Sequence, residues 1–179
     1  MITKIEAAFP RGNCRICAFG PDDSAVPLVL FFPDAFGPRP ATFAVAEELA
    51  SEGWRVLMPD PFYEHAPYEP IPPKSIFEGG PQQEQLMALF TSITPDKIRA
   101  DVAALIALAA ERSDPGVPFA ATGYCMGGRY TLAALAASER VVFGATFHAS
   151  TLSPAEGDGP HRDLGSVKPG MFQHAVGAL

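Results

Sequence analysis

Cysteine is scarce in this chain, which has three cysteines among 179 residues. Three cysteines cannot supply the dense disulfide framework of a small secreted domain. The first ten residues, MITKIEAAFP, also lack the apolar segment of a secretory signal. We therefore expect a protein of the reducing cytoplasm.

Long apolar runs and positive charge are also in short supply. No apolar run is long enough to cross a bilayer, so we expect no membrane association. The 13 basic residues are outnumbered by 20 acidic ones, which leaves a net charge of -7. A surface of this sign is repelled by nucleic acid and by anionic membranes, so neither is an expected partner.

The composition is that of an ordinary globular chain, with 47% hydrophobic and 18% charged residues. The 19 prolines and 16 glycines lie between periodic segments, where turns and helix ends are expected. We find no internal repeat and no linker. The sequence therefore predicts one domain over residues 1–179.

Apolar, β-rich runs alternate with helical patterns along the chain. Strands are predicted at residues 2–9, 13–20, 27–33, 54–60, 117–123, 141–149 and 168–179, and helices at 43–53, 82–90, 95–113 and 126–138. Such alternation predicts an α/β fold with three layers, a mostly parallel sheet and helices on both faces. Ligands of such sheets bind outside the carboxyl ends of the strands, which directs attention to the loops after Phe32, Gly123 and Phe147.

The segment GYCMGG, residues 123–128, follows a predicted strand and precedes a predicted helix. This is the pattern of a nucleophile elbow, with Cys125 in place of the usual serine. Gly123 and Gly127 would allow strand and helix to come close, and Gly128 would serve helix packing. The helix N-terminus would favour a thiolate, and the Met126 amide would face a developing oxyanion. The alternative is a small core cysteine at a turn.

GYCMGGRY, together with FFPDAFGPRP and LASEGWRVLMPDPFY, resembles the dienelactone hydrolase family, a cysteine-nucleophile branch of the α/β-hydrolase fold. The resemblance runs from about Pro27 to the C-terminus. It implies a hydrolase of ester or lactone bonds that needs no cofactor. It also implies that Ala35 supplies a second oxyanion amide and that Asp34 is an acid that contacts the Cys125 thiol. The alternative for Asp34 is an Asx-turn after a proline.

Four further residues are candidates for lining the substrate pocket. They are Phe36, Tyr63, Tyr124 and His148, although core or rim packing explains each of them as well. We expect no metal site. Cys14 and Cys17 are spaced like metal ligands but would face opposite sides of a strand, and no second ligand pair is present.

A hydrolase of this fold places an acid and then a histidine after the nucleophile. The resemblance implies that this chain ends before the family's last strands and before both residues. The candidates that follow Cys125 lie at none of the family's positions: Glu156, Asp158, His161, Asp163 and His174. Three hypotheses stay open: an enzyme acting on a small-molecule ester or lactone, a binding module without catalysis, and a shortened product. We expect a monomer or a weak homo-oligomer.

Overall fold

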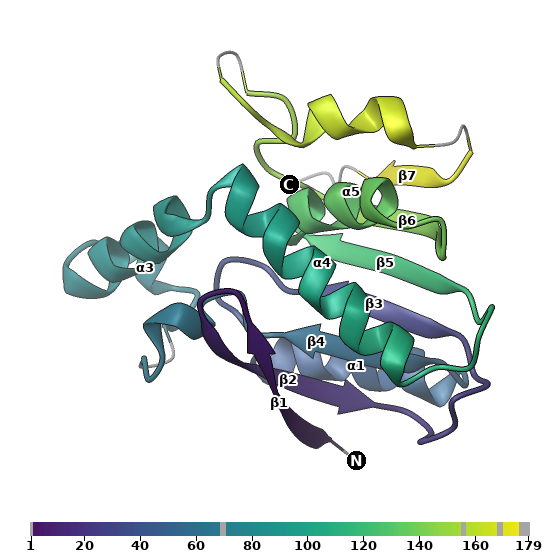
Figure 1. Cartoon of the computed structure of the whole chain (residues 1–179). Coiled ribbons are helices and arrows are strands. Elements are labelled where there is room, and N and C mark those ends of the chain that lie inside the picture. Colours follow the sequence, from purple (N-terminus) through teal and green to yellow (C-terminus); the bar gives the residue numbers. More distant parts are fainter. Residues whose placement is uncertain (1, 69–70, 155–156, 168–169, 176–179) are drawn as a thin grey trace.

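A computed structural model describes residues 2–68, 71–154, 157–167 and 170–175. Its centre is a seven-stranded sheet with the order β1-β2-β4-β3-β5-β6-β7 (Figure 1). The strands are β1 (Thr3–Phe9), β2 (Gly12–Phe19), β3 (Leu28–Phe32), β4 (Arg55–Pro59), β5 (Phe119–Tyr124), β6 (Val141–Phe147) and β7 (Phe172–Ala175). The strands from β3 to β7 are parallel, whereas β1 and β2 form an antiparallel pair at one edge. The mostly parallel α/β sheet is therefore confirmed.

Helices cover both faces of the sheet. They are α1 (Pro40–Ser51), α2 (Ser75–Glu78), α3 (Pro81–Ser92), α4 (Pro95–Glu111) and α5 (Gly127–Ala137), with two short 3-10 helices, η1 (Tyr63–His65) and η2 (Pro160–Ser166). In Figure 1, α4 and α5 lie in front of the sheet, and α1 lies behind it. This arrangement gives the expected three layers.

Local signals explain where the helices begin. The Thr94 side chain caps α4 by accepting a hydrogen bond from the Lys97 N–H at 3.3 Å, and Pro95 occupies the first turn, as expected. The predicted start of α1 at Phe43 was wrong, because the helix begins at Pro40. Neither α2 nor η2 was predicted, since both are too short to show a helical period.

Each sheet face has its own core. Leu28 and Leu30 of β3 pack beneath α4 and α5, whereas Val29 and Phe31 of the same strand pack beneath α1. All five β3 residues are buried because both faces of this strand are covered. Cys14 and Cys17 belong to different cores, which confirms that they face opposite sides of β2.

The α1 face is less completely covered. Helix α1 packs against β2 and β4. On β6, Gly144 faces Leu135 of α5, so the neighbouring Phe143 points to the opposite face, where 38% of it is exposed. Within the described residues, no helix combines the length and the apolar character that a bilayer crossing requires.

Candidate active site

Cys125 occupies a sharp turn between the end of β5 at Tyr124 and the start of α5 at Gly127. Its φ of 51° is left-handed, a conformation that residues other than glycine rarely adopt. Such strain persists where the surrounding structure enforces it, and it gathers at functional sites. The strand–turn–helix placement expected from GYCMGG is thus present.

Close backbone contacts hold this turn in place. A Cβ on Gly127 would lie 2.2 Å from the Phe32 carbonyl oxygen, and a Cβ on Gly123 would lie 2.2 Å from the Gly127 carbonyl oxygen. The requirement for small residues is therefore met at both glycines. Gly128 allows α5 to pack closely on the loop after β6, because a Cβ placed there would lie 2.3 Å from the Ala149 Cβ.

The loop after β6 is bonded directly to the turn. The Cys125 N–H donates to the Phe147 carbonyl at 3.0 Å, and the Ser150 N–H donates to the Cys125 carbonyl at 3.2 Å. The Cys125 thiol also lies 3.8 Å from the Ser150 hydroxyl. His148 and Thr151 share the left-handed backbone, with φ of 40° and 57°. Sequence reasoning missed Ser150, since no local pattern links it to the thiol.

Two backbone amides are free to donate near the thiol. Ala35 follows the end of β3, the segment on which Gly127 packs, and Met126 directly follows Cys125. Within the described part of the chain, neither N–H has a hydrogen-bond acceptor. This is the condition that two oxyanion donors require before a substrate binds.

Asp34 does not contact the thiol in this structure. Arg39 donates to both of its carboxylate oxygens, at 2.6 and 2.7 Å, and the Phe36 N–H donates to Oδ1 at 3.0 Å. The contact with the Phe36 N–H is the Asx-turn that was the alternative interpretation. The Asp34 carboxylate therefore orders the loop that carries Ala35. Its ion-pair partner, Arg39, lies five residues further along the same loop.

Tyr124 directly precedes Cys125, and its ring contacts that of His148 in the loop after β6. The Tyr124 ring stacks on Phe147 at 4.8 Å between centroids, and the His148 ring meets Tyr124 edge-on at 6.2 Å. Burial raises the pKa of the Tyr124 phenol, so this residue stays neutral. His148 is exposed and directly follows Phe147, whose carbonyl accepts the Cys125 N–H.

Tyr63 is a core residue, which is the alternative interpretation of this candidate. Its hydroxyl donates to Asp101 at 2.7 Å and accepts the Arg11 N–H at 3.3 Å, while its ring packs edge-on against Phe9. Burial raises the pKa of both Tyr63 and Asp101. These contacts fix Tyr63 in a structural network beneath α4.

The candidates downstream of Cys125 have other partners. Arg99 of α4 pairs with Asp158 at 2.7 Å and with Asp163 at 3.3 Å. The His161 backbone N–H donates to the Leu152 carbonyl. The ring Nδ1 of His161 is buried without a partner among the described residues. Glu156 and the His174 side chain lie outside the described residues. In the described part of the chain, the hydrogen-bond partner of the thiol is Ser150.

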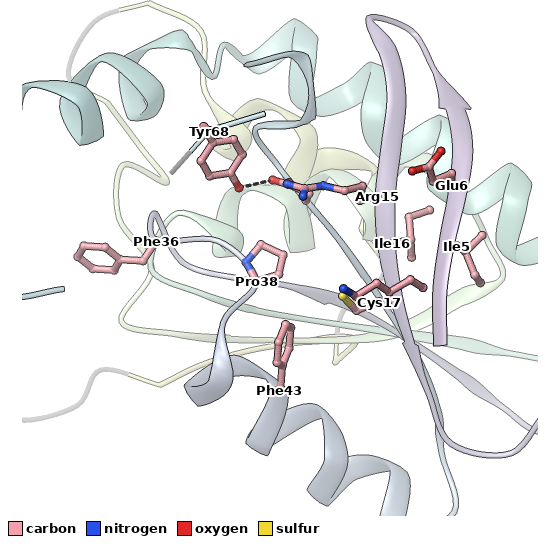
Figure 2. A pocket seen from close by; sticks show the side chains of 11 residues that line it. Ile5, Glu6, Arg15, Ile16, Cys17, Phe36, Pro38, Phe43 and Tyr68 are labelled. Atoms are coloured by element: carbon pink, nitrogen blue, oxygen red, sulfur yellow. Dashed lines mark hydrogen bonds and ion pairs between the residues drawn. The ribbon is translucent and has the colours of Figure 1, made fainter. Parts of the chain in front are cut away.

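A cavity of about 250 Å³ lies beside β2, and Cys125 is not among its lining residues (Figure 2). Its walls include Lys4, Arg15, Cys17, Phe36, Phe43 and Tyr68. Arg15 donates to Asp60 at 2.7 Å, and the Tyr68 hydroxyl donates to the same carboxylate at 2.7 Å. Of the residues predicted to line a pocket, Phe36 lines this one, under the Arg39 guanidinium at 5.3 Å.

No cluster of three or more metal-ligating side chains exists among the described residues. The sheet order, the helices on both faces and the strained cysteine at the strand–helix turn define an α/β-hydrolase fold. The family model for the dienelactone hydrolase family matches residues 15–162. The chain belongs to that family, which places it among the hydrolases.

Solved structures share this fold. The protein m3DLH superposes with a TM-score of 0.70 at 22% identity, over 98% of this chain and 67% of its own. The dienelactone hydrolase-like promiscuous phosphotriesterase P91, from metagenomic libraries, gives 0.61 at 19% identity, over 98% of this chain and 80% of its own. The thioesterase domain of the curacin biosynthetic pathway gives 0.59 at 19%, over 88% and 49%. No curated protein has a matching sequence.

Proposed function

We propose that the chain is a hydrolase of small-molecule carboxylic esters or lactones in which Cys125 is the nucleophile. The observation that carries this proposal is the left-handed backbone of Cys125 at the turn between β5 and α5. A core cysteine gains nothing from such strain, whereas a nucleophile gains an exposed position at the carboxyl end of the sheet.

The reaction proceeds in two stages. The thiolate sulfur of Cys125 bonds to the carbonyl carbon, and the negative charge moves to the carbonyl oxygen. This oxygen accepts hydrogen bonds from the N–H groups of Ala35 and Met126. The bond to the leaving alkoxide then breaks, and the alkoxide takes a proton from water. Water next attacks the thioester, so the acid departs and the thiol is regenerated.

Two neighbours position these groups. Asp34, through its ion pair with Arg39, holds the loop so that the Ala35 amide stays in place. Ser150 orients the thiol through the contact at 3.8 Å. Since no described histidine or carboxylate contacts the thiol, we expect the second stage to be slow. General acid–base assistance is typically worth about 10²- to 10⁴-fold in rate.

The test uses p-nitrophenyl acetate with the unmodified chain, a Cys125→Ser variant and, as a matched control, a Cys17→Ser variant. We expect a burst near one equivalent of p-nitrophenol, with the acetyl group on the Cys125 peptide by mass spectrometry. The Cys17→Ser variant should retain the burst, and the Cys125→Ser variant should lose it.

A burst that persists without Cys125 would overturn the assignment of the nucleophile. Rapid multiple turnover by the unmodified chain would contradict the slow second stage and would direct attention to His148 as the base.

A further inference from the structure

The loop after β6 holds the Ser150 hydroxyl against the Cys125 thiol. The Cys125 N–H donates to the Phe147 carbonyl, and the Ser150 N–H donates to the Cys125 carbonyl, so backbone hydrogen bonds hold the loop at both ends. A third contact lies between them, because Gly128 leaves room for Ala149. The thiol Sγ and the hydroxyl Oγ are 3.8 Å apart. The backbone of the loop therefore fixes the position of this hydroxyl.

The backbone is strained on both sides of this serine. His148 has a φ of 40° and Thr151 has a φ of 57°, and neither residue is glycine. Ser150 itself is partly buried. Left-handed backbone at such residues persists where the surrounding contacts enforce it, and it gathers at functional sites. The loop that carries Ser150 thus shows the same kind of strain as the turn that carries Cys125.

A hydroxyl at this distance reaches an acyl group on the sulfur. In the thioester of the proposed reaction, the acyl carbon is bonded directly to Sγ of Cys125. An oxygen 3.8 Å from the sulfur lies within about 3–3.5 Å of that carbon when it approaches roughly at right angles to the C–S bond. This is the separation of a near-attack geometry, and the approach is toward the face of the carbonyl group.

We propose that Ser150 accepts the acyl group from Cys125, so that an oxygen ester on Ser150 follows the thioester. The hydroxyl oxygen bonds to the acyl carbon, the C–S bond breaks, and the hydroxyl proton passes to the departing sulfur, which restores the thiol. The transfer runs in this direction because a thiol is a stronger acid than an alcohol, so sulfur is the better leaving group. This inference rests on the proposed function, since the Cys125 thioester is its starting point.

The location of the acetyl group over time tests the transfer. The unmodified chain is treated briefly with p-nitrophenyl acetate, freed of reagent, and denatured at increasing times. Trypsin cleaves after Arg129 and Arg140, so Cys125 and Ser150 lie in separate peptides. Mass spectrometry should find the acetyl group first on Cys125 and later on Ser150. Hydroxylamine at neutral pH should remove the early label, which is a thioester, but not the later one, which is an oxygen ester.

Three variants accompany this measurement. Ser150→Ala removes the acceptor and keeps the backbone N–H that holds the loop. We expect its Cys125 thioester to last at least about tenfold longer than that of the unmodified chain, because a positioned hydroxyl outcompetes bulk water. Ser153→Ala is the matched control, since this exposed serine lies in the same peptide and should change nothing. In Cys125→Ala, the acetyl group should not appear on Ser150.

Different outcomes separate the transfer from the proposed function. An acetyl group that stays on Cys125, with equal lifetimes in the unmodified chain and in Ser150→Ala, would overturn the transfer and leave the proposed function standing. Acetylation of Ser150 in Cys125→Ala would also overturn the transfer, because Ser150 would then react with the ester directly. The absence of a burst and of any acetyl group on Cys125 would refute the proposed function, and the transfer with it.

Discussion

The cavity beside β2 and the region of the Cys125 turn differ in whether their buried polar groups have hydrogen-bond partners. In the cavity, the Asp60 carboxylate accepts hydrogen bonds from Arg15, Tyr68 and the Phe62 N–H. At the turn, the Arg129 Nε and Nη2 have no acceptor within the described residues. The hydrogen-bonding groups of Asp60 are therefore paired, and, in the part of the chain that the structure describes, those of Arg129 Nε and Nη2 are not.

Paired and unpaired polar groups contribute differently to stability. A satisfied carboxylate such as Asp60 ties β2 to the loop after β4 and contributes to stability. The buried Arg129 donors have no acceptor among the described residues, so they contribute no such hydrogen bond to stability.

The largest expected effect compares the thiols of the two regions. Cys17 lines the cavity, Cys14 lies on the other face of β2, and burial raises the pKa of both, that of Cys14 to about 12. At about pH 8, roughly one Cys14 in ten thousand is thiolate. Limiting iodoacetamide should therefore label Cys125 at least about 100-fold faster than either. The labelled cysteines are mapped by mass spectrometry. Preferential labelling of Cys17 would contradict the prediction that Cys125 is the most reactive thiol.

A substitution at the turn should break its geometry. In Gly127→Ala, the new methyl group would meet the Phe32 carbonyl oxygen, and the strand and helix would have to separate. We expect the free energy of unfolding to fall by about 2–3 kcal/mol, measured by urea denaturation, with slower alkylation of Cys125. The control is Gly165→Ala, because a methyl group there has no atom within 4 Å. Equal stability of the two variants would show that the close approach is unimportant.

In the cavity, Asp60→Asn should lower the stability of the fold without changing the rate of Cys125 alkylation. The substitution removes the charge that Arg15 and Tyr68 face, and we expect a loss of about 2 kcal/mol in the free energy of unfolding. Asp22→Asn, at an exposed position, should stay within about 0.5 kcal/mol of the unmodified chain. If Asp60→Asn slowed Cys125 alkylation instead, the cavity would be part of the site.

The exposed side of β6 should promote weak self-association. Phe143 presents apolar surface on the less covered face of the sheet. Phe143→Thr should lower the dimer fraction in sedimentation velocity at high concentration by about twofold. Phe77→Thr on α2, which removes a 91% exposed ring, is the control that locates the contact. A dimer fraction lowered only by Phe77→Thr would move the contact to α2.

The smallest effect concerns the segment around η2. Its ion pairs with Arg99 lower the pKa of Asp158 below the ordinary 3.8. A lowered carboxyl pKa means that the contact contributes fully above that value and is lost as the pH falls through the folded-state pKa. Arg99→Gln should raise hydrogen exchange in residues 157–166 a few-fold at neutral pH, and Arg162→Gln should not. A difference between Arg99→Gln and the unmodified chain that persisted below both pKa values would exclude these carboxylates.

Local patterns account for much of the fold. Buried runs such as LVLFF predicted the central strands, and Thr94 with Pro95 marked the start of α4. GYCMGG placed Cys125 at the turn, because a glycine-bounded residue between strand and helix has few other conformations. Helix α2 escaped prediction, since four residues carry no period.

The sequence by itself determined the order of the elements, the family and the turn at Cys125, because these depend on neighbouring residues. Tertiary structure decided the partners of the side chains. It placed Tyr63 in the core with Asp101, set Ser150 beside the thiol, and left the edge of Arg129 unpaired among the described residues. The physical reason is that burial and hydrogen bonding depend on which distant segments meet, and sequence spacing does not encode those distances.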